Sequence, residues 1–123
     1  MARILIAEDD DAIRNLVARA LNEDGHDLTV TVDGAAALEA LDRHDVEYDL
    51  LLSDVKMPVM DGIALALAAG SHHPDVAIML MTGYAEQRER AHGLDALVHD
   101  VIVKPFSVAQ IKGAVREALI SRL

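Results

Sequence analysis

The chain has 123 residues, of which 52% are hydrophobic and none is cysteine, so it can build the core of one domain but neither a disulfide nor a thiolate metal site. Its net charge of −10 and its aromatic content of 2% argue against binding nucleic acid through phosphate contacts or base stacking. No apolar run approaches the roughly 18 residues that span a bilayer, and the N-terminus lacks a signal-peptide layout. We therefore expect a cytoplasmic protein without membrane insertion.

Short apolar runs alternate with amphipathic segments along the chain. The first run, Arg3 to Ala7, is apolar after its first residue, which is typical of a strand buried on both faces. Four further strands are predicted over residues 28–32, 49–53, 76–81 and 101–103. Helices are predicted from residue 13 to a C-terminal cap at Gly25, and over residues 35–41, 63–69, 86–97 and 108–119. Gly70 to Pro74 are expected to end the third helix, and Gly93 interrupts the fourth.

This order is a strand followed by a helix, repeated five times with short connections. Such alternation predicts an α/β fold in which a five-stranded parallel sheet carries helices on both faces, with right-handed crossovers. We see no linker or repeat, and we expect a single domain over residues 1–123. Ligands of such sheets bind at the edge formed by the carboxyl ends of the strands.

Polar residues directly follow four of the five predicted strands. Glu8 and Asp9 follow the first strand, Asp54 the third, Thr82 the fourth and Lys104 the fifth. Several oxygen ligands together suit Mg²⁺, and an Asp carboxylate can accept a phosphoryl group as a nucleophile. A Lys can balance phosphoryl charge and a Thr hydroxyl can donate to a phosphoryl oxygen. The sequence therefore predicts a site for a divalent cation and a phosphoryl group at this edge.

Other polar residues near these strands have a simpler interpretation. Asp10 and Asp11 extend the acidic run, and one of them is expected to cap the first helix, because Asp favours the N-cap and acids favour the first turn. Asp61, before Gly62, is also interpreted as a cap rather than a ligand. The six histidines are scattered without the spacing of a metal site, so we interpret them as surface residues rather than phosphodonors.

The motifs ILIAEDD, LLLSDVKMPVMDG, IMLMTGYA and VIVKPF occur in this order, and together they resemble the motifs of response-regulator receiver domains. The resemblance covers essentially the whole chain. It implies a doubly wound, flavodoxin-like (CheY-like) (βα)5 fold with strand order 2-1-3-4-5. It also implies a signalling switch that is not a turnover enzyme and that catalyses only its own phosphorylation and dephosphorylation.

The resemblance implies a role for each acidic residue at the predicted edge. Asp54 would accept a phosphoryl group from the phosphohistidine of a histidine kinase or a histidine phosphotransfer protein. Asp9 would bind Mg²⁺ directly, with Mn²⁺ as an alternative ion, and Glu8 would bind it mostly through water. Asp54 and the backbone carbonyl of Lys56 would complete the protein ligands.

Two further positions carry over from the resemblance, and two depart from it. Lys104 would contact the phosphoryl group and precede a cis bond to Pro105, while Thr82 would turn toward the phosphoryl group on activation. Val101 stands where many receivers have an aromatic ring that reorients, so the aromatic half of that switch is missing. Leu67 stands where receivers commonly have a charged residue; it belongs either to an Ala-rich helix or to an apolar patch for a partner or dimer.

We expect a stand-alone receiver without a DNA-binding output domain, because the sequence ends directly after the last predicted helix. It would act on another protein, as a monomer or weak dimer. ILIAEDD, PDVAIMLMTGYA and the non-aromatic Val101 resemble small receivers that regulate protease-dependent degradation in alphaproteobacteria. That likeness implies that the unphosphorylated form is active and delivers substrates to a protease.

Three alternatives remain open from the sequence. The chain could serve as a phosphate sink or shuttle in a phosphorelay. It could be a degenerate receiver that only binds its partner. It could also be a phosphatase of the haloacid-dehalogenase type, since residues 9–11 contain the D-x-D pattern, although Ala12 and Ile13 follow where that family has Thr or Val.

Overall fold

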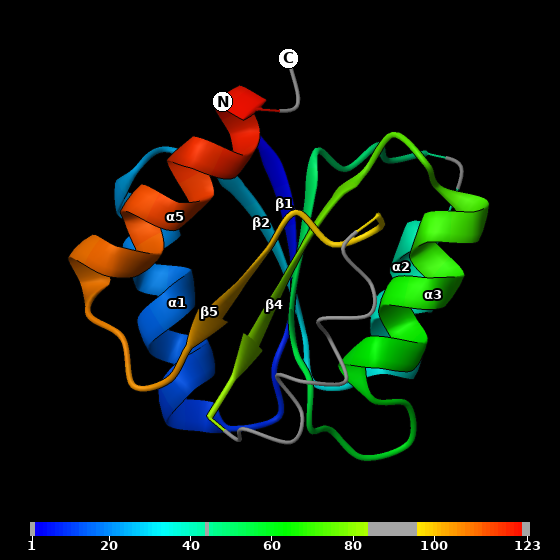
Figure 1. The fold of residues 1–123 in the computed structure, drawn as a ribbon, viewed down its shortest axis with the longest axis horizontal. Helices are drawn as coiled ribbons and strands as arrows, with labels where there is room; N and C mark the ends of the chain where they lie inside the picture. Colours follow the sequence, from blue (N-terminus) through cyan, green and yellow to red (C-terminus); the bar gives the residue numbers. More distant parts are fainter. Residues whose placement is uncertain (1, 44, 84–95, 122–123) are drawn as a thin grey trace.

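The computed structural model describes residues 2–43, 45–83 and 96–121, in which helices pack on both sides of a parallel sheet (Figure 1). The strands are β1 (Arg3–Ala7), β2 (Asp27–Thr31), β3 (Leu50–Asp54), β4 (Ala77–Thr82) and β5 (Asp100–Val103). The helices within the described residues are α1 (Asp11–Glu23), α2 (Gly34–Leu41), α3 (Gly62–His72) and α5 (Val108–Ser121). The helix predicted over residues 86–97 falls mostly on residues 84–95, which lie outside the described ones.

The order of the strands across the sheet is β2-β1-β3-β4-β5, and every neighbouring pair is parallel. The predicted fold class and strand order are therefore confirmed. The strand bounds agree with the predicted ones to within one residue at each end, the usual uncertainty at element ends.

The central strands alternate their side chains between two hydrophobic cores, because successive residues of a strand point to opposite faces. Leu5, Leu51 and Leu80 pack with α2 and α3 on one face. Their neighbours Ile4 and Leu52 pack with α1 and α5 on the other face. Each such side chain contributes about 1.5–3 kcal/mol by leaving water. These two cores fix the strands so that their carboxyl ends share one edge of the sheet.

Acidic caps set where three of the helices begin. The carboxylates of Asp10, Asp33 and Asp61 accept hydrogen bonds from backbone N–H groups in the first turns of α1, α2 and α3. Such caps contribute about 1 kcal/mol each. Of Asp10 and Asp11, one of which was expected to cap the first helix, Asp10 is the cap, and the cap predicted at Asp61 is confirmed. Gly25 follows α1 with φ 83°, a conformation that favours glycine, as its predicted role at the end of that helix requires.

The third helix ends between Gly70 and Pro74, as predicted, but α3 runs to His72, beyond the predicted helical range of residues 63–69. Gly70 serves packing rather than termination: a Cβ added there would lie 2.7 Å from the side chain of Leu97. His73 caps the helix by donating its N–H to the carbonyl of Ala69 at 2.7 Å, and Pro74 follows. None of the described helices combines the length and the apolar character that crossing a membrane requires.

Candidate functional site

The structure brings the residues that follow the strands together at the carboxyl edge of the sheet. Asp54 ends β3 and pairs in register with Met81 of β4. Thr82 ends β4, and its carbonyl accepts the backbone N–H of Lys104 at 2.8 Å. Glu8 follows β1 and is anchored by its N–H to a carbonyl of β2. Hydrogen bonding between neighbouring strands therefore sets the spacing of these side chains.

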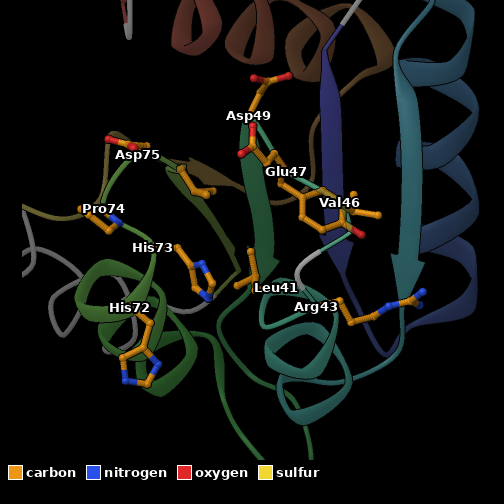
Figure 2. Close-up of a pocket in the computed structure, with 11 residues that line it drawn as sticks. Leu41, Arg43, Val46, Glu47, Asp49, His72, His73, Pro74 and Asp75 are labelled. Atoms are coloured by element: carbon orange, nitrogen blue, oxygen red, sulfur yellow. The ribbon is translucent and has the colours of Figure 1, made fainter.

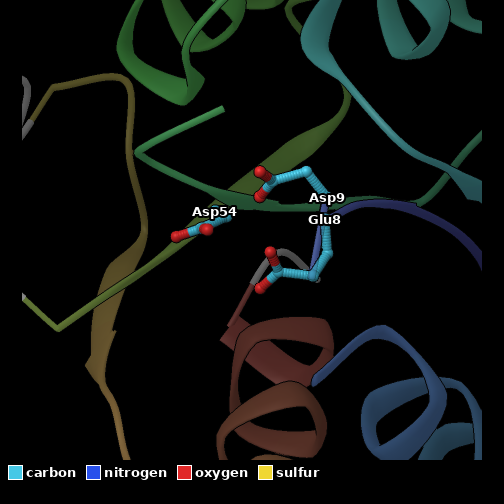
Figure 3. A group of neighbouring side chains, drawn as sticks. All are labelled: Glu8, Asp9 and Asp54. Carbon is cyan, nitrogen blue, oxygen red and sulfur yellow. The ribbon is translucent and has the colours of Figure 1, made fainter. Parts of the chain in front are cut away.

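Three carboxylates converge at this edge. One carboxylate oxygen from each of Glu8, Asp9 and Asp54 lies within 4.8 Å of the others, and Figure 3 shows the three side chains gathered from two neighbouring strand ends. Glu8 is fully buried, Asp54 is 6% exposed and Asp9 is exposed. Among the described residues this is the one group of three or more acidic or histidine side chains close enough to share a metal ion.

Lys104 bridges two of these carboxylates. Its Nζ lies 2.9 Å from Oε1 of Glu8 and 3.0 Å from Oδ2 of Asp54. Burial alone would lower the pKa of Lys104, but its hydrogen bonds to Glu8 and Asp54 outweigh burial and raise that pKa. The side chain is thus held as an ammonium. The Lys104–Pro105 peptide bond is cis, as the resemblance implied.

The crowding and burial of the carboxyl groups are reflected in their pKa values. Burial raises the pKa of Glu8, the hydrogen bond from Lys104 opposes that shift, and the nearby Asp54 adds to it. Burial and contact with Glu8 likewise raise the pKa of Asp9. One ammonium thus faces three carboxyl groups, an excess of negative charge that a divalent cation would relieve. Mg²⁺ and Mn²⁺ prefer such oxygen ligands, so the donor set fits either ion.

The backbone around Asp54 is tightly held. Its Oδ1 accepts the N–H of Val55 at 2.9 Å, and its carbonyl accepts the Ser53 hydroxyl at 2.9 Å. Gly62, at the start of α3, donates its N–H to the carbonyl of Val55 at 2.8 Å. A Cβ at Gly62 would lie 2.0 Å from the carbonyl oxygen of Asp54. A glycine is therefore required for α3 to support this loop so closely.

Lys56, Thr82 and Val101, three further positions discussed from the sequence, lie within the described residues. Lys56 is exposed and borders, with Asp9, Asp54 and Lys104, a depression of about 480 Å³. Thr82 is almost completely buried at the end of β4. Val101 is partly buried against the core on the α2 and α3 side of the sheet. The Mg²⁺-binding role of the Lys56 carbonyl, the phosphoryl-contacting role of Thr82 and a switch without an aromatic ring at Val101 remain predictions.

One residue in contact with the site was not predicted. Arg14 of α1 reaches back and donates from Nη1 to the carbonyl oxygens of Glu8 and Asp9, at 3.1 and 3.4 Å. In sequence, an Arg in the first turn of an amphipathic helix is typical of a solvated charge. Its acceptors are backbone carbonyls, which no residue pattern marks.

Other hollows also border the described residues. An apolar depression of about 440 Å³ lies beside Lys104 and is lined by Ala12, Ile13, Leu16, Pro105 and Phe106. A larger hollow of about 650 Å³ lies at the opposite edge of the sheet, between the ends of α2 and α3 (Figure 2). The expectation of surface histidines holds for the exposed His72, but one ring nitrogen of the half-buried His26 is enclosed.

Comparison with known proteins gives a consistent result. The family model described as response regulator receiver domain matches residues 4–116. The response regulator receiver protein CpdR of Brucella abortus is 36% identical over 98% of this chain and 99% of its own length. The sensor kinase CckA of the same organism is 35% identical over 96% of this chain, which spans 12% of that kinase.

Solved structures agree with this result. The chemotaxis response regulator CheY4 of Vibrio cholerae has a TM-score of 0.85 and 26% identity, covering 96% of this chain and 98% of its own. A CheY-like receiver domain protein of Methanospirillum hungatei has a TM-score of 0.89 and 26% identity, covering 99% and 96%. The predicted likeness to receiver domains, including the small receiver type, is confirmed.

Proposed function

The chain belongs to the response regulator receiver domain family, and we propose that it is a phosphorylation-dependent switch of a two-component pathway with Asp54 as the phosphoacceptor. The observation that carries the proposal is the environment of Asp54, which pairs with Lys104 at 3.0 Å and lies beside Glu8 and Asp9 at the carboxyl edge. This arrangement offers a nucleophile, a phosphoryl-binding cation and a set of oxygen ligands in one place.

The proposed reaction transfers a phosphoryl group to a carboxylate. An oxygen of Asp54 attacks phosphorus, the P–N bond of a phosphohistidine breaks, and its electron pair returns to the imidazole, which takes a proton. Glu8, Asp9, Asp54 and the backbone carbonyl of Lys56 would hold Mg²⁺, which neutralises charge on the phosphoryl oxygens when bound. Lys104 lies within reach of Asp54 and supplies a second positive charge there.

The state of the site would be read through Thr82 and Lys104. Both lie at strand ends next to Asp54, and the backbone of Lys104 bonds to that of Thr82 at 2.8 Å. A hydroxyl and an ammonium that turn toward a new phosphoryl group would bias a two-state equilibrium of the surrounding surface. With Val101 in place of an aromatic ring, that shift would proceed without ring reorientation.

The phosphodonor would be a histidine kinase or a histidine phosphotransfer protein. The apolar depression formed by Ala12, Ile13, Leu16, Pro105 and Phe106 opens beside Lys104 and supports docking of a donor whose histidine must reach Asp54. The match to part of a sensor kinase fits pathways in which kinases and receivers work together.

We assign the output to a protein target. The 36% identity to CpdR over nearly the full length of both chains supports a role with protease machinery, in which the unphosphorylated form is active. A reconstituted degradation assay tests this role by comparing the unphosphorylated protein with its phosphorylated form. Equal activity of the two forms would contradict a phosphorylation-controlled protease role.

The phosphoacceptor proposal is tested by incubating the protein with Mg²⁺ and acetyl phosphate and measuring its intact mass. We expect a gain of one phosphoryl group that is absent in Asp54→Ala and absent when a chelator removes Mg²⁺. Asp75→Ala, at an exposed acid of the opposite edge, is the matched control and should gain the group normally. A gain of the same size in Asp54→Ala would overturn the assignment.

A further inference from the structure

Arg14 is bound to the backbone of the loop that carries the acidic group. Its Nη1 donates to the carbonyl oxygens of Glu8 and Asp9, at 3.1 and 3.4 Å, and its Nη2 forms an ion pair with the carboxylate of Asp11. The Arg14 side chain is only 18% exposed, although it belongs to the first turn of a surface helix. The guanidinium is therefore a fixed part of this loop.

These contacts fix the direction of two carboxylate side chains. The carbonyls of Glu8 and Asp9 belong to the peptide planes on either side of Asp9, so holding both carbonyls sets the orientation of its Cα–Cβ bond. Glu8 is held further by the N–H of Asp10, which donates to Glu8 Oε2 at 3.2 Å. Both side chains are thus aimed toward Asp54 by contacts within the loop itself.

Such a restraint is needed because the carboxylates oppose their own convergence. Glu8, Asp9 and Asp54 bring like charges within 4.8 Å, and Asp9 is exposed, so an unrestrained loop would let Asp9 turn toward water. The guanidinium holds both carbonyls through Nη1 while its Nη2 pairs with Asp11, and the single nitrogen of an ammonium on a flexible stem cannot reproduce that planar, two-nitrogen geometry.

We propose that Arg14 is a positioning residue for the divalent cation: by holding the Glu8 and Asp9 carbonyls, it keeps their carboxylates converged with that of Asp54. This inference rests on the proposed function, because it needs a cation at the site. Arg14 itself binds neither the cation nor the phosphoryl group. Its contribution lies in the backbone between β1 and α1.

An explanation based only on the charge of Arg14 predicts the opposite effect of its removal on Mg²⁺ binding. Arg14 is a cation near the site, so its removal would strengthen binding of Mg²⁺ if only long-range electrostatics mattered. If Arg14 positions the ligands, its removal weakens binding. A residue that merely fastened α1 to the loop would change the stability of the protein and leave the affinity of the folded protein for Mg²⁺ unchanged.

The test measures the Kd of Mg²⁺ alone by titration calorimetry for the wild type, Arg14→Met and Arg14→Lys. We expect both variants to bind about tenfold more weakly, the size of effect typical of residues that orient metal ligands. Arg14→Lys keeps the charge and the apolar stem, so it isolates the geometry and carries the test if Arg14→Met does not fold. Arg19→Met, at an exposed arginine of the same helix, is the control and should bind like the wild type.

The other possible results distinguish failure of the role proposed for Arg14 from failure of the proposed function. Wild-type affinity in Arg14→Lys, or tighter binding in Arg14→Met, would refute the positioning role and leave the proposed function intact. A wild-type protein that does not bind Mg²⁺ would refute the proposed function, and the role of Arg14 with it. Thermal unfolding with and without Mg²⁺ gives an independent readout, in which the stabilisation by Mg²⁺ should shrink in both Arg14 variants.

Discussion

The two edges of the sheet both carry charged side chains around a hollow, yet they differ in how the charges are matched. At the amino edge, which is formed by the amino ends of the strands, His73 lies 2.8 Å from Asp42 and Arg43 lies 3.1 Å from Asp45, and all four side chains are at least partly exposed. At the carboxyl edge, the single ammonium of Lys104 is shared by Glu8 and Asp54, both buried.

The way the charges are matched identifies the functional site better than the volumes of the two hollows do. The hollow at the amino edge is the larger, about 650 Å³ against about 480 Å³ (Figure 2). An exposed ion pair such as Arg43 with Asp45 gains little from further ligands, whereas crowded carboxylates with raised pKa values are stabilised by a cation. The carboxyl edge is therefore the place where a ligand changes the protein most.

Removing the ammonium group of Lys104, which Glu8 and Asp54 share, should have the largest effect on stability. Without its ammonium, Lys104→Met leaves two buried carboxylates uncompensated, and we expect a loss of about 3 kcal/mol in the free energy of unfolding at pH 7 in a chelating buffer. Urea unfolding measures this, and Mg²⁺ should restore part of the loss. A loss below about 1 kcal/mol would mean that the contacts of Lys104 stabilise the protein no more than ordinary surface ion pairs do.

Disturbing the packing of α3 beneath the carboxyl edge should have the next largest effect on stability. Gly62→Ala would force a Cβ to within 2.0 Å of the Asp54 carbonyl oxygen, and we expect destabilisation by about 2–3 kcal/mol. Gly113→Ala is the matched control, because no atom lies within 4 Å of a Cβ there; it should stabilise α5 by about 0.5–1 kcal/mol. Chemical denaturation of both variants compares them, and equal effects would contradict tight support of Asp54 by α3.

Removing the negative charge of Asp9 should change the stability by a smaller amount that depends on pH. The pKa of Asp9 is raised, so the folded state holds its proton more firmly than the unfolded state, and stability falls as the pH rises above the ordinary value of 3.8. In a chelating buffer Asp9→Asn should thus be more stable than the wild type at pH 7, by at most about 1 kcal/mol because Asp9 is exposed.

The same variant should lose that advantage as the pH falls below 3.8, where the Asp9 carboxyl is protonated in both states. Thermal unfolding across pH measures the difference. An Asp9→Asn variant that is less stable than the wild type at pH 7 would show that the carboxylate is not under strain.

The amino edge should respond least. Asp42→Asn removes the partner of His73, but Asp42 is 52% exposed and caps the C-terminal end of α2, where a negative charge opposes the helix dipole. These effects offset, so we expect the free energy of unfolding to change by less than about 0.5 kcal/mol. A loss as large as that of Lys104→Met would erase the distinction between the two edges.

The strand ends, and with them the site, could be predicted because the chemistry there changes abruptly. Apolar runs stop at Glu8, Asp54, Thr82 and Lys104, and parallel topology places such ends along one edge. A cap at Asp10 or Asp11 and the cap at Asp61 were also predictable, because local hydrogen bonds within one turn depend only on nearby residues.

Contacts set by tertiary packing could not be predicted in this way. Arg14 acts on backbone carbonyls, and Gly70 lies inside α3 because Leu97, distant in sequence, packs against it. Val59 has φ 70°, and the N–H of Met60 donates to the carbonyl of Pro58 across it at 2.8 Å. That conformation is strained for a β-branched residue, so no propensity would assign it to valine.

The central claim is that the carboxyl edge is a cation-dependent phosphoacceptor site at Asp54. The most direct measurement treats the protein with acetyl phosphate and Mg²⁺, reduces the acyl phosphate with borohydride, and locates the modified residue by peptide mass spectrometry. We predict modification at Asp54 alone, and only when a divalent cation is present. Modification of Asp9 or a histidine instead, or equal modification of Asp54 in a chelating buffer, would contradict the account.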